Sequence, residues 1–388
     1  ATGVSADGTV VCGYSSSGSS GTSQEAFRWT AADGMVALGV LPGGTFNSLA
    51  NAVSADGSTV VGYSGSASGN QAFRWTEATG MVGLGDLPGG STASYAYGVS
   101  AHGEVVVGYS PSARSGTRTE AFRWTATNGM VGLGVLPGGD FESRAWGISA
   151  DGTVIAGEST SSEGNQAFRW TAGSGMAGLS DLAGGSSTSI AYAISADGST
   201  ITGYGTPPAN VHEAFRWTLA GGLIGLGALP CNTWSIGRAV SGDGSVLVGD
   251  PQISTCACVF IWDAQHGMRD LLSVLSTEHG LNLAGWQLCR ATGLSFDGSI
   301  IVGYGHNPLG QTEAWIANLA PPVLRVRRAA NDVVLSWPTN ATGFLLQSAS
   351  SLPPSGWMDA ADVPVVVETE FTVMKTASNR AQFYRLKK

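Results

Sequence analysis

Charged residues are scarce in this chain. Asp, Glu, Lys and Arg make up 12% of its 388 residues, only three are lysines, and the net charge is −9 with an isoelectric point near 5.0. Nucleic-acid binding rests on basic surface, so this charge balance argues against it. No apolar run approaches the roughly 18 to 20 residues that a membrane-spanning helix needs. We therefore expect a soluble protein with no membrane span.

Histidine is also scarce, and its five copies do not pair on one element. They are His102, His212, His266, His279 and His306. A metal site usually needs several such ligands at short spacing, and no nucleophile, acid-base or phosphate-binding motif takes its place. The sequence predicts no enzyme, no cofactor and no metal. An enzymatic alternative would have to assemble its site near His212, His266 or Asp250.

Cysteine is rare too, and four of the five copies gather in one part of the chain. Disulfides are expected among these four, with the pairing open: Cys231, Cys256, Cys258 and Cys289. Cys256 and Cys258 could instead belong to a metal site, although few ligands lie near them. The chain also starts inside a repeat, as a mature chain does after removal of a signal peptide. Both observations predict an exported, extracellular or cell-surface protein.

Glycine, by contrast, is abundant, with 57 copies, and it belongs to a repeated pattern. The short motif Gln71 to Thr76, Gln-Ala-Phe-Arg-Trp-Thr, recurs along the chain, and we call each such recurring motif a word. Its other copies are Glu25 to Thr30, Glu120 to Thr125, Gln166 to Thr171, Glu213 to Thr218 and the degenerate Val259 to Trp262 and Glu313 to Ile316. A period of roughly 20 to 50 residues indicates stacked supersecondary units that bury their apolar faces against one another.

Each unit contains four short strand-like words. In the unit 95–139 they lie at 96–100, 105–109, 121–125 and 130–134. A serine before the first turn recurs in seven units at spacings of 49, 46, 49, 46, 46 and 54 residues. Four strands in about 46 residues is the size of a propeller blade. The sequence therefore predicts an all-β protein whose residues 1–319 form a seven-bladed β-propeller.

An Asp-Gly pair connects the first two words of six units, and His102 replaces the aspartate in the third. Asp-Gly between β words predicts a hairpin turn in which both central residues take a positive φ. These turn residues are Asp7, Asp56, Asp151, Asp197, Asp243 and Asp297.

Alternation along the third word puts its two aromatic residues on one face, and we expect them to pack between blades. This framework set is Phe27, Trp29, Phe73, Trp75, Phe122, Trp124, Phe168, Trp170, Phe215, Trp217, Phe260, Trp262 and Trp315. The arginine between the aromatics, such as Arg74, is expected to bond a carboxylate or a backbone carbonyl within the ring rather than a ligand.

The loops between the second and third words vary in length, and in a propeller they emerge on one face. Variable loops on a rigid scaffold are a common place for binding. These loops are rich in Ser, Gly and Thr, however, which also suits solvated tips without a ligand. A carbohydrate-binding propeller would show clustered aromatics and carboxylates on this face.

The last two units depart from the pattern. In the sixth, Met268, Leu271, Leu272 and Leu275 recur at helical spacing, which predicts an inserted helix over 267–281. The seventh lacks the fourth word, so the ring is expected to be one strand short. An open sheet edge of this kind invites pairing with another chain.

Residues 320–388 have a different composition. Strand-like segments at 323–328, 332–337, 343–348, 363–372 and 382–386 predict a small β-sandwich of immunoglobulin or fibronectin type. This part carries a net charge of +3 and the rest −12, so copies could attract one another head to tail. The candidate basic contacts are Arg325, Arg327, Arg328, Lys387 and Lys388.

The words Val-Ser-Ala-Asp-Gly, Ala-Phe-Arg-Trp-Thr, Gly-Met-Val-Gly-Leu-Gly and Leu-Pro-Gly-Gly together resemble the HAF-repeat family of bacterial extracellular proteins. The resemblance covers about residues 1–319 and implies export and a propeller-like fold. It brings no catalytic residues, and Glu or Gln stands where the family name places His. The terminal module looks like domains at the ends of bacterial surface proteins.

These observations favour a secreted, non-catalytic surface protein that associates head to tail into a fibre or matrix. Head-to-tail contacts that do not close into a ring produce a fibre. Two alternatives stay open. One is a carbohydrate-binding or glycan-degrading propeller, with surface glycans as partners, and the other is a monomeric adhesion or ligand-binding module.

Overall fold

The computed structural model describes residues 1–16, 18, 23–208, 211–251, 256, 258–320, 322–338, 344–351, 356–368, 370–376 and 382–387. The protein is all-β, with one short helix among the described residues. Two compact units are present, one formed by 1–271 with 285–318 and the other by 272–284 with 319–388.

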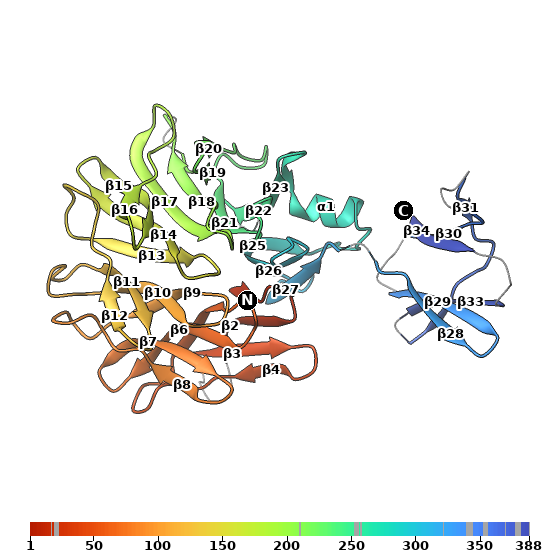
Figure 1. Cartoon of the computed structure of the whole chain (residues 1–388), viewed down its shortest axis with the longest axis horizontal. Coiled ribbons are helices and arrows are strands. Elements are labelled where there is room, and N and C mark those ends of the chain that lie inside the picture. The colour runs from red at the N-terminus through yellow and green to blue at the C-terminus, as the bar shows by residue number, and fades with distance from the viewer. Residues whose placement is uncertain are drawn as a thin grey trace. The chain divides into compact units, whose positions relative to one another are not determined.

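The first unit contains seven antiparallel sheets in chain order (Figure 1). Sheet 1 contains β1 (Gly3–Val4), β2 (Val10–Ser16), β3 (Gln24–Thr30) and β4 (Gly34–Ala37); sheet 2 contains β5 (Ser48–Val53), β6 (Thr59–Ser66), β7 (Gly69–Thr76) and β8 (Gly80–Gly83). Sheet 3 contains β9 (Tyr95–Val99), β10 (Val105–Ser110), β11 (Glu120–Thr125) and β12 (Gly129–Gly132); sheet 4 contains β13 (Ser143–Ile148), β14 (Val154–Ser161), β15 (Gly164–Thr171) and β16 (Gly175–Gly178). Sheet 5 contains β17 (Ser186–Ile194), β18 (Thr200–Thr206), β19 (Glu213–Thr218) and β20 (Gly222–Gly225); sheet 6 contains β21 (Ile236–Val240), β22 (Val246–Asp250), β23 (Phe260–Asp263) and β24 (Gly267–Asp270). Sheet 7 contains β25 (Gln287–Leu294), β26 (Ile300–His306) and β27 (Thr312–Asn318), and a parallel bridge between Asn165 and Thr188 also joins sheets 4 and 5.

Backbone hydrogen bonds connect the seven sheets into a closed ring. In each sheet the turn after the first strand bonds to the same turn of the next sheet, and Phe296 of sheet 7 donates to Ala6 of sheet 1 at 3.1 Å. The other six bonds are Ala6 to Ala55, Asp56 to Ala101, Ala101 to Ala150, Ala150 to Ala196, Ala196 to Gly242 and Gly242 to Phe296. The first strand of every sheet therefore lies at the centre, as in a β-propeller.

Apolar side chains fill the seams between neighbouring sheets. Phe73 of sheet 2 is fully buried against Leu38 and Leu41, which lie in the connection that leaves sheet 1. Corresponding clusters fill the seams around Phe122, Phe168, Phe215 and Phe260. The expectation that the third-strand aromatics pack between sheets is confirmed at these positions.

The hairpin turns differ from the prediction in one respect. Gly8 has a φ of +74°, but no aspartate is among the described residues with positive φ. The amide of Gly8 donates to the carbonyl of Ser5 at 3.0 Å, and the Asp7 carboxylate accepts from the Ser5 hydroxyl at 2.6 Å and from the Thr9 amide at 3.0 Å. The prediction of two positive φ values was wrong because the turn is longer and the side-chain bonds of the aspartate brace it.

The helix in the sixth unit is shorter than predicted. It is α1 (Leu271–Thr277), whereas Gly267–Asp270 is the outer strand β24. Gly267 has a φ of +69° and Met268 pairs with Trp262, as the corresponding Gly-Met pairs do in sheets 1 to 4. The helical spacing was therefore misleading over its first four residues, because the strand word of the repeat precedes the helix.

The second unit contains two sheets. One has the order β28 (Arg325–Ala329), β29 (Asp332–Pro338), β33 (Glu370–Thr376), β32 (Val365–Val367), and the other β31 (Met358–Asp359), β30 (Leu345–Ala349), β34 (Phe383–Lys387). Trp337 and Val373 of the first sheet share a core with Leu346 of the second. The predicted single strand 363–372 is instead a hairpin, because Glu368 takes a φ of +56° and turns the chain.

Candidate functional site

Seven side chains at one repeat position surround the central channel of the ring. Each stands three residues before the serine that opens the hairpin turn, in the first strand of its sheet or, for Thr2, directly before it. They are Thr2, Asn51, Tyr97, Trp146, Tyr192, Arg238 and Thr292, which we call the mouth ring. Together with the next residues of the first strands they line a cavity of about 220 Å³. The mouth ring is the most varied layer of the channel.

The rest of the channel is apolar and uniform. Two residues further along each first strand, the side chains are Val, Ile or Leu, and two residues beyond these they are Ala in five sheets. This second layer surrounds a smaller cavity of about 160 Å³. The repeats thus keep one end of the channel nearly constant and differ at the other end, where a ligand would meet distinct chemical groups.

A second set of side chains lies around the mouth ring, near the end of the second strand of each sheet. It consists of Tyr14, Tyr63, Tyr109, Glu158, Tyr204, Asp250 and Tyr304. The loops to the third strands begin just beyond these residues. The mouth therefore opens on the face that carries the variable loops.

Aromatic rings follow one another around this face from sheet 2 to the connection before sheet 6. Neighbouring ring centroids are 4.2 to 6.1 Å apart, in the range of favourable aromatic pairs. The aromatic series is Tyr63, Tyr95, Tyr109, Tyr97, Trp146, Tyr192, Tyr204, His212 and Trp234. All members except the buried Tyr204 are partly accessible, so the series combines a rigid support with open ring surface.

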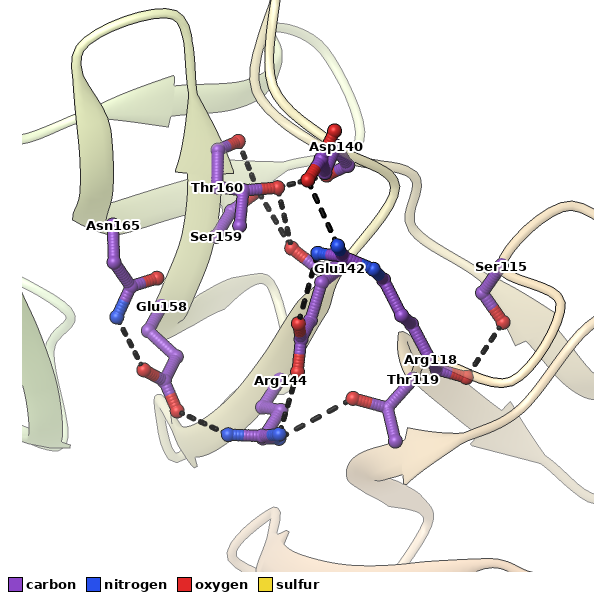
Figure 2. Close-up of polar contacts among 10 residues, drawn as sticks. All are labelled: Ser115, Arg118, Thr119, Asp140, Glu142, Arg144, Glu158, Ser159, Thr160 and Asn165. Atoms are coloured by element: carbon purple, nitrogen blue, oxygen red, sulfur yellow. Dashed lines mark hydrogen bonds and ion pairs between the residues drawn. The ribbon is translucent and has the colours of Figure 1, made fainter.

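Arg144 of β13 holds the polar part of the mouth in sheets 3 and 4 (Figure 2). Its guanidinium contacts Glu142 at 2.6 Å, Glu158 at 3.3 Å and Thr119 at 3.2 Å, and it lies 5.5 Å from the centre of the Tyr109 ring. The second carboxylate oxygen of Glu158 accepts from Asn165 at 2.6 Å. These contacts fix Glu158, whose side chain is only 8% exposed.

Arg238 of the mouth ring makes an equivalent contact in sheet 6. It donates to Asp250 at 2.9 and 3.3 Å, and its guanidinium lies 5.0 Å from the centre of the Tyr192 ring. Arg290 of sheet 7 lies 3.9 Å from the same carboxylate. The Asp250 side chain is 1% exposed, so the ion pair with Arg238 compensates the cost of burying its charge.

Two polar atoms in the aromatic series have no hydrogen-bond partner in the described part of the chain. They are the indole nitrogen of Trp146 and Nδ1 of His212, both buried from solvent. Buried polar groups are nearly always hydrogen-bonded, so an unpaired one needs a partner such as water or a ligand. Trp146 also lines the cavity of the mouth ring, so this unpaired donor belongs to a cavity-lining residue.

Burial keeps the titratable rings of the mouth neutral. It raises the pKa of Tyr97, Tyr109 and Tyr192 above the ordinary tyrosine value, and it raises the pKa of Tyr204 to about 12. Burial also lowers the pKa of His212, so its imidazole is uncharged at pH 7. With three arginines and three carboxylates (Glu142, Glu158 and Asp250) beside them, the mouth offers hydrogen bonds without a large excess of charge.

The structure assigns partners to most of the predicted residues. Arg74 donates to the carbonyl of Gly103 in sheet 3 at 2.9 Å, as expected of a framework arginine. The four clustered cysteines form the disulfides Cys231–Cys258 and Cys256–Cys289. His306 lies within 4.8 Å of the second pair, but the disulfide engages both sulfur atoms.

Three residues were named for a possible enzymatic site. His212 belongs to the aromatic series, and Asp250 belongs to the set of side chains around the mouth ring, where it bonds Arg238. His266 instead bonds Asp263 in the hairpin between β23 and β24. In the second unit Arg325 pairs with Glu370, and Arg327 is exposed. Arg328 and Lys387 lie on β28 and β34, and Lys388 lies outside the described residues.

Sequence reasoning missed the mouth ring and the Arg144 contacts. A signal was present, because aligning the seven repeats on the turn serine shows one first-strand position occupied by Thr, Asn, Tyr, Trp, Tyr, Arg and Thr. Motifs that recur between repeats do not include this position, because its residue varies among the seven sheets.

No family model and no curated protein matches the chain. Among solved structures, it is similar to TolB from Acinetobacter baumannii, with 10% identity, a TM-score of 0.42 and coverage of 87% of this chain and 79% of that one. It is also similar to Kuenenia stuttgartiensis hydrazine synthase, with 15% identity, a TM-score of 0.48 and coverage of 82% and 95%. Likeness at this level identifies no family, and the resemblance to HAF repeats stays a prediction.

None of the described helices is long and apolar enough to cross a membrane.

Proposed function

We propose that the protein is an exported carbohydrate-binding module, a seven-bladed propeller that holds a neutral sugar at its mouth ring. The observation that carries the proposal is the aromatic series, of which Tyr97, Trp146 and Tyr192 line the cavity, together with the unpaired indole donor of Trp146. Aromatics and carboxylates clustered on the loop face are what a carbohydrate-binding propeller requires. The predicted fibre protein does not explain why this layer differs from repeat to repeat.

The chemistry of the mouth matches a sugar ring. The C–H groups on the face of a pyranose are apolar and weakly positive, and they pack on the negative face of an aromatic ring. Sugar hydroxyls both donate and accept, so they can pair with Trp146, with the tyrosine hydroxyls and with the charged groups that surround them. The cavity of about 220 Å³ is smaller than ordinary drug-sized pockets, which favours one sugar residue in the channel and the rest of a chain on the surrounding rings.

Binding without hydrolysis follows from the carboxylates. A glycosidase needs a carboxylic acid and a carboxylate that are free to face the substrate. Here Glu158 and Asp250 each bond an arginine and are nearly buried, and the partly exposed Glu142 also bonds Arg144. We therefore infer that they orient Arg144 and Arg238 rather than act on a glycosidic bond.

A glycan array of neutral and anionic oligosaccharides, probed with the labelled full chain, tests the proposal. We expect binding to neutral glycans that weakens at least tenfold in Trp146→Ala. Trp146→Phe separates the two contributions, because it keeps the ring and removes the N–H donor. Trp357→Ala, in the second unit, is the control and should bind as the parent does. The proposal fails if no neutral glycan binds, or if Trp146→Ala and Trp357→Ala bind equally.

Self-association into a fibre is a second proposal, supported by the basic residues of the second unit and the acidic composition of the first. Arg327 is exposed on β28, and the first 319 residues carry the acidic excess. We expect filaments in negative-stain electron microscopy of the full chain at low salt and their loss at high salt, since salt screens exposed charges. Single particles under both conditions would exclude charge-driven assembly.

We also propose that the protein is exported and that residues 320–388 form a β-sandwich of immunoglobulin type. The two disulfides support export, because disulfides persist in oxidising compartments. The core that the two sheets of the second unit share around Trp337 supports the sandwich.

A further inference from the structure

The seam between sheet 7 and sheet 1 is built differently from the others. In six sheets the first leucine after the outer strand donates its amide, each time at 2.8 Å, to a carbonyl of the third strand or, in sheet 6, of Val259 directly before it. In sheet 2, for example, Leu84 donates to Ala72, and the Ala72 amide donates to the Ser94 hydroxyl at 2.9 Å. The second leucine, Leu87, donates to Ser110 of the next sheet at 3.2 Å. One connecting word thus bonds both walls of its seam.

Sheet 7 has no such word, because the described chain leaves it after three strands. Ala314 of β27 is the counterpart of Ala72, and no described residue bonds its backbone in this way. It lines a cavity of about 760 Å³ between sheets 7 and 1. The missing strand therefore leaves a gap inside the ring as well as an exposed edge.

The opposite wall of this cavity has the same residues as the filled seams. Phe27 corresponds to Phe73, and Met35 to Met81, and both line the cavity. Met35 is 57% exposed, whereas Met81 packs against the core of its seam. Ser15 corresponds to the leucine-binding serines Ser64, Ser110 and Ser159, which are fully buried, yet Ser15 is exposed. The serine acceptor (Ser15), the aromatic wall (Phe27) and the strand edge (β27) are all present, but the connecting word that contacts their counterparts in other seams is absent from the described residues.

We propose that this seam is a strand-docking site whose occupant is one further copy of the connecting word, Gly-Met-Val-x-Leu-Gly-x-Leu-Pro-Gly-Gly. Its first strand would pair with the free edge of β27, which is the β-augmentation mode of peptide recognition. Its first leucine would bond Ala314 and its second Ser15, while both side chains fill the space beside Phe27. The occupant lies outside residues 1–388, because the chain's own words already fill their seams. The docked strand completes the ring whether or not the mouth binds sugar or the protein forms fibres.

The probe is a fluorescein-labelled synthetic peptide with the sequence of residues 80–94, titrated with the protein of residues 1–388 and followed by fluorescence anisotropy. We expect saturable binding of one peptide per chain. A control peptide with both leucines, at positions 84 and 87, replaced by aspartate should bind at least tenfold more weakly, because charged groups cannot fill the apolar wall.

Two protein variants locate the site. Ser15→Arg places a long charged side chain in the cavity and should weaken peptide binding at least tenfold. Ser68→Arg, at an exposed hairpin tip of sheet 2, should bind as the parent does. A photo-crosslinker at the first leucine of the peptide should label Phe27 or Met35. Absence of saturable binding, equal binding by Ser15→Arg and the parent, or crosslinks confined to other sheets would each overturn the proposal.

Discussion

Removing the ring of Phe27 should cost much less stability than removing that of Phe122, although the two residues occupy the same repeat position. Phe122 is fully buried and packs with Leu84 and Leu87. Its replacement by alanine leaves a new void, and such substitutions cost about 3 to 5 kcal/mol. Phe27 is 4% exposed, but one side of it borders the cavity of about 760 Å³. Atoms beside an empty space have already lost contacts on that side, so Phe27→Ala should cost closer to the transfer term alone, about 1.5 to 3 kcal/mol.

Equilibrium urea unfolding, followed by tryptophan fluorescence, measures the two losses on the same protein. Phe122→Ala should lower the free energy of unfolding by about 1 to 2 kcal/mol more than Phe27→Ala does, which is the difference between the two costs given above. Adding the peptide of residues 80–94 should remove this difference, because a filled seam makes Phe27 equivalent to Phe122. Equal losses for both variants without peptide would refute the reasoning, since they would mean that the seam is packed in solution.

Three further results are expected. Hydrogen bonds from the turn serine and its neighbours lower the pKa of the turn aspartates; for Asp56, partial burial acts against them, and the pKa is still brought to about 2. The stability that these bonds contribute is thus present above the ordinary value of 3.8 and lost as the pH falls toward 2, so acid unfolding monitored by circular dichroism should shift to higher pH in Asp151→Asn. Gly103→Ala should lower the urea midpoint far more than Gly80→Ala: both have positive φ, which costs about 1 to 2 kcal/mol for alanine, but an added Cβ meets the Thr59 side chain at 2.1 Å only at Gly103. Reduction of the disulfides, which close spans of 27 and 33 residues, should lower the thermal midpoint, with about 3 to 4 kcal/mol per bond in the chain-entropy model; an unchanged midpoint after complete reduction would contradict this.

The repeated words predict the ring well because each word has one structural task in every copy. Phe73 faces its seam and Arg74 reaches the next hairpin turn, and both followed from alternation and from the expectation that framework arginines bond within the ring. The error in the helix of the sixth unit occurred where two patterns overlap. Leu271 and its neighbours have helical spacing, but the residues before them also complete a strand word, and the backbone pairing of β24 with β23 prevailed.

The candidate site could not be predicted in the same way. Trp146, Tyr192 and Arg238 come from three sheets, and only closure of the ring brings them to one cavity. The cavity between sheets 7 and 1 is different, because it follows from the absence of a connecting word after sheet 7 rather than from residues that are present. The sequence indicated the missing strand and the open edge, but not that Phe27 and Ser15 of sheet 1 would face the resulting space.

The closed set of backbone bonds at the apolar end of the channel has a consequence for how such a protein can diversify. Because those bonds use main-chain atoms, and the layer above them uses only aliphatic side chains, the ring does not depend on which residue each repeat contributes to the mouth. Exchanging one repeat for another by recombination would change one of the seven side chains of the mouth ring and leave the backbone ring unaltered. Ligand selectivity could then change one repeat at a time. Recombination among tandem repeats would therefore generate many combinations of mouth-ring residues on the same scaffold.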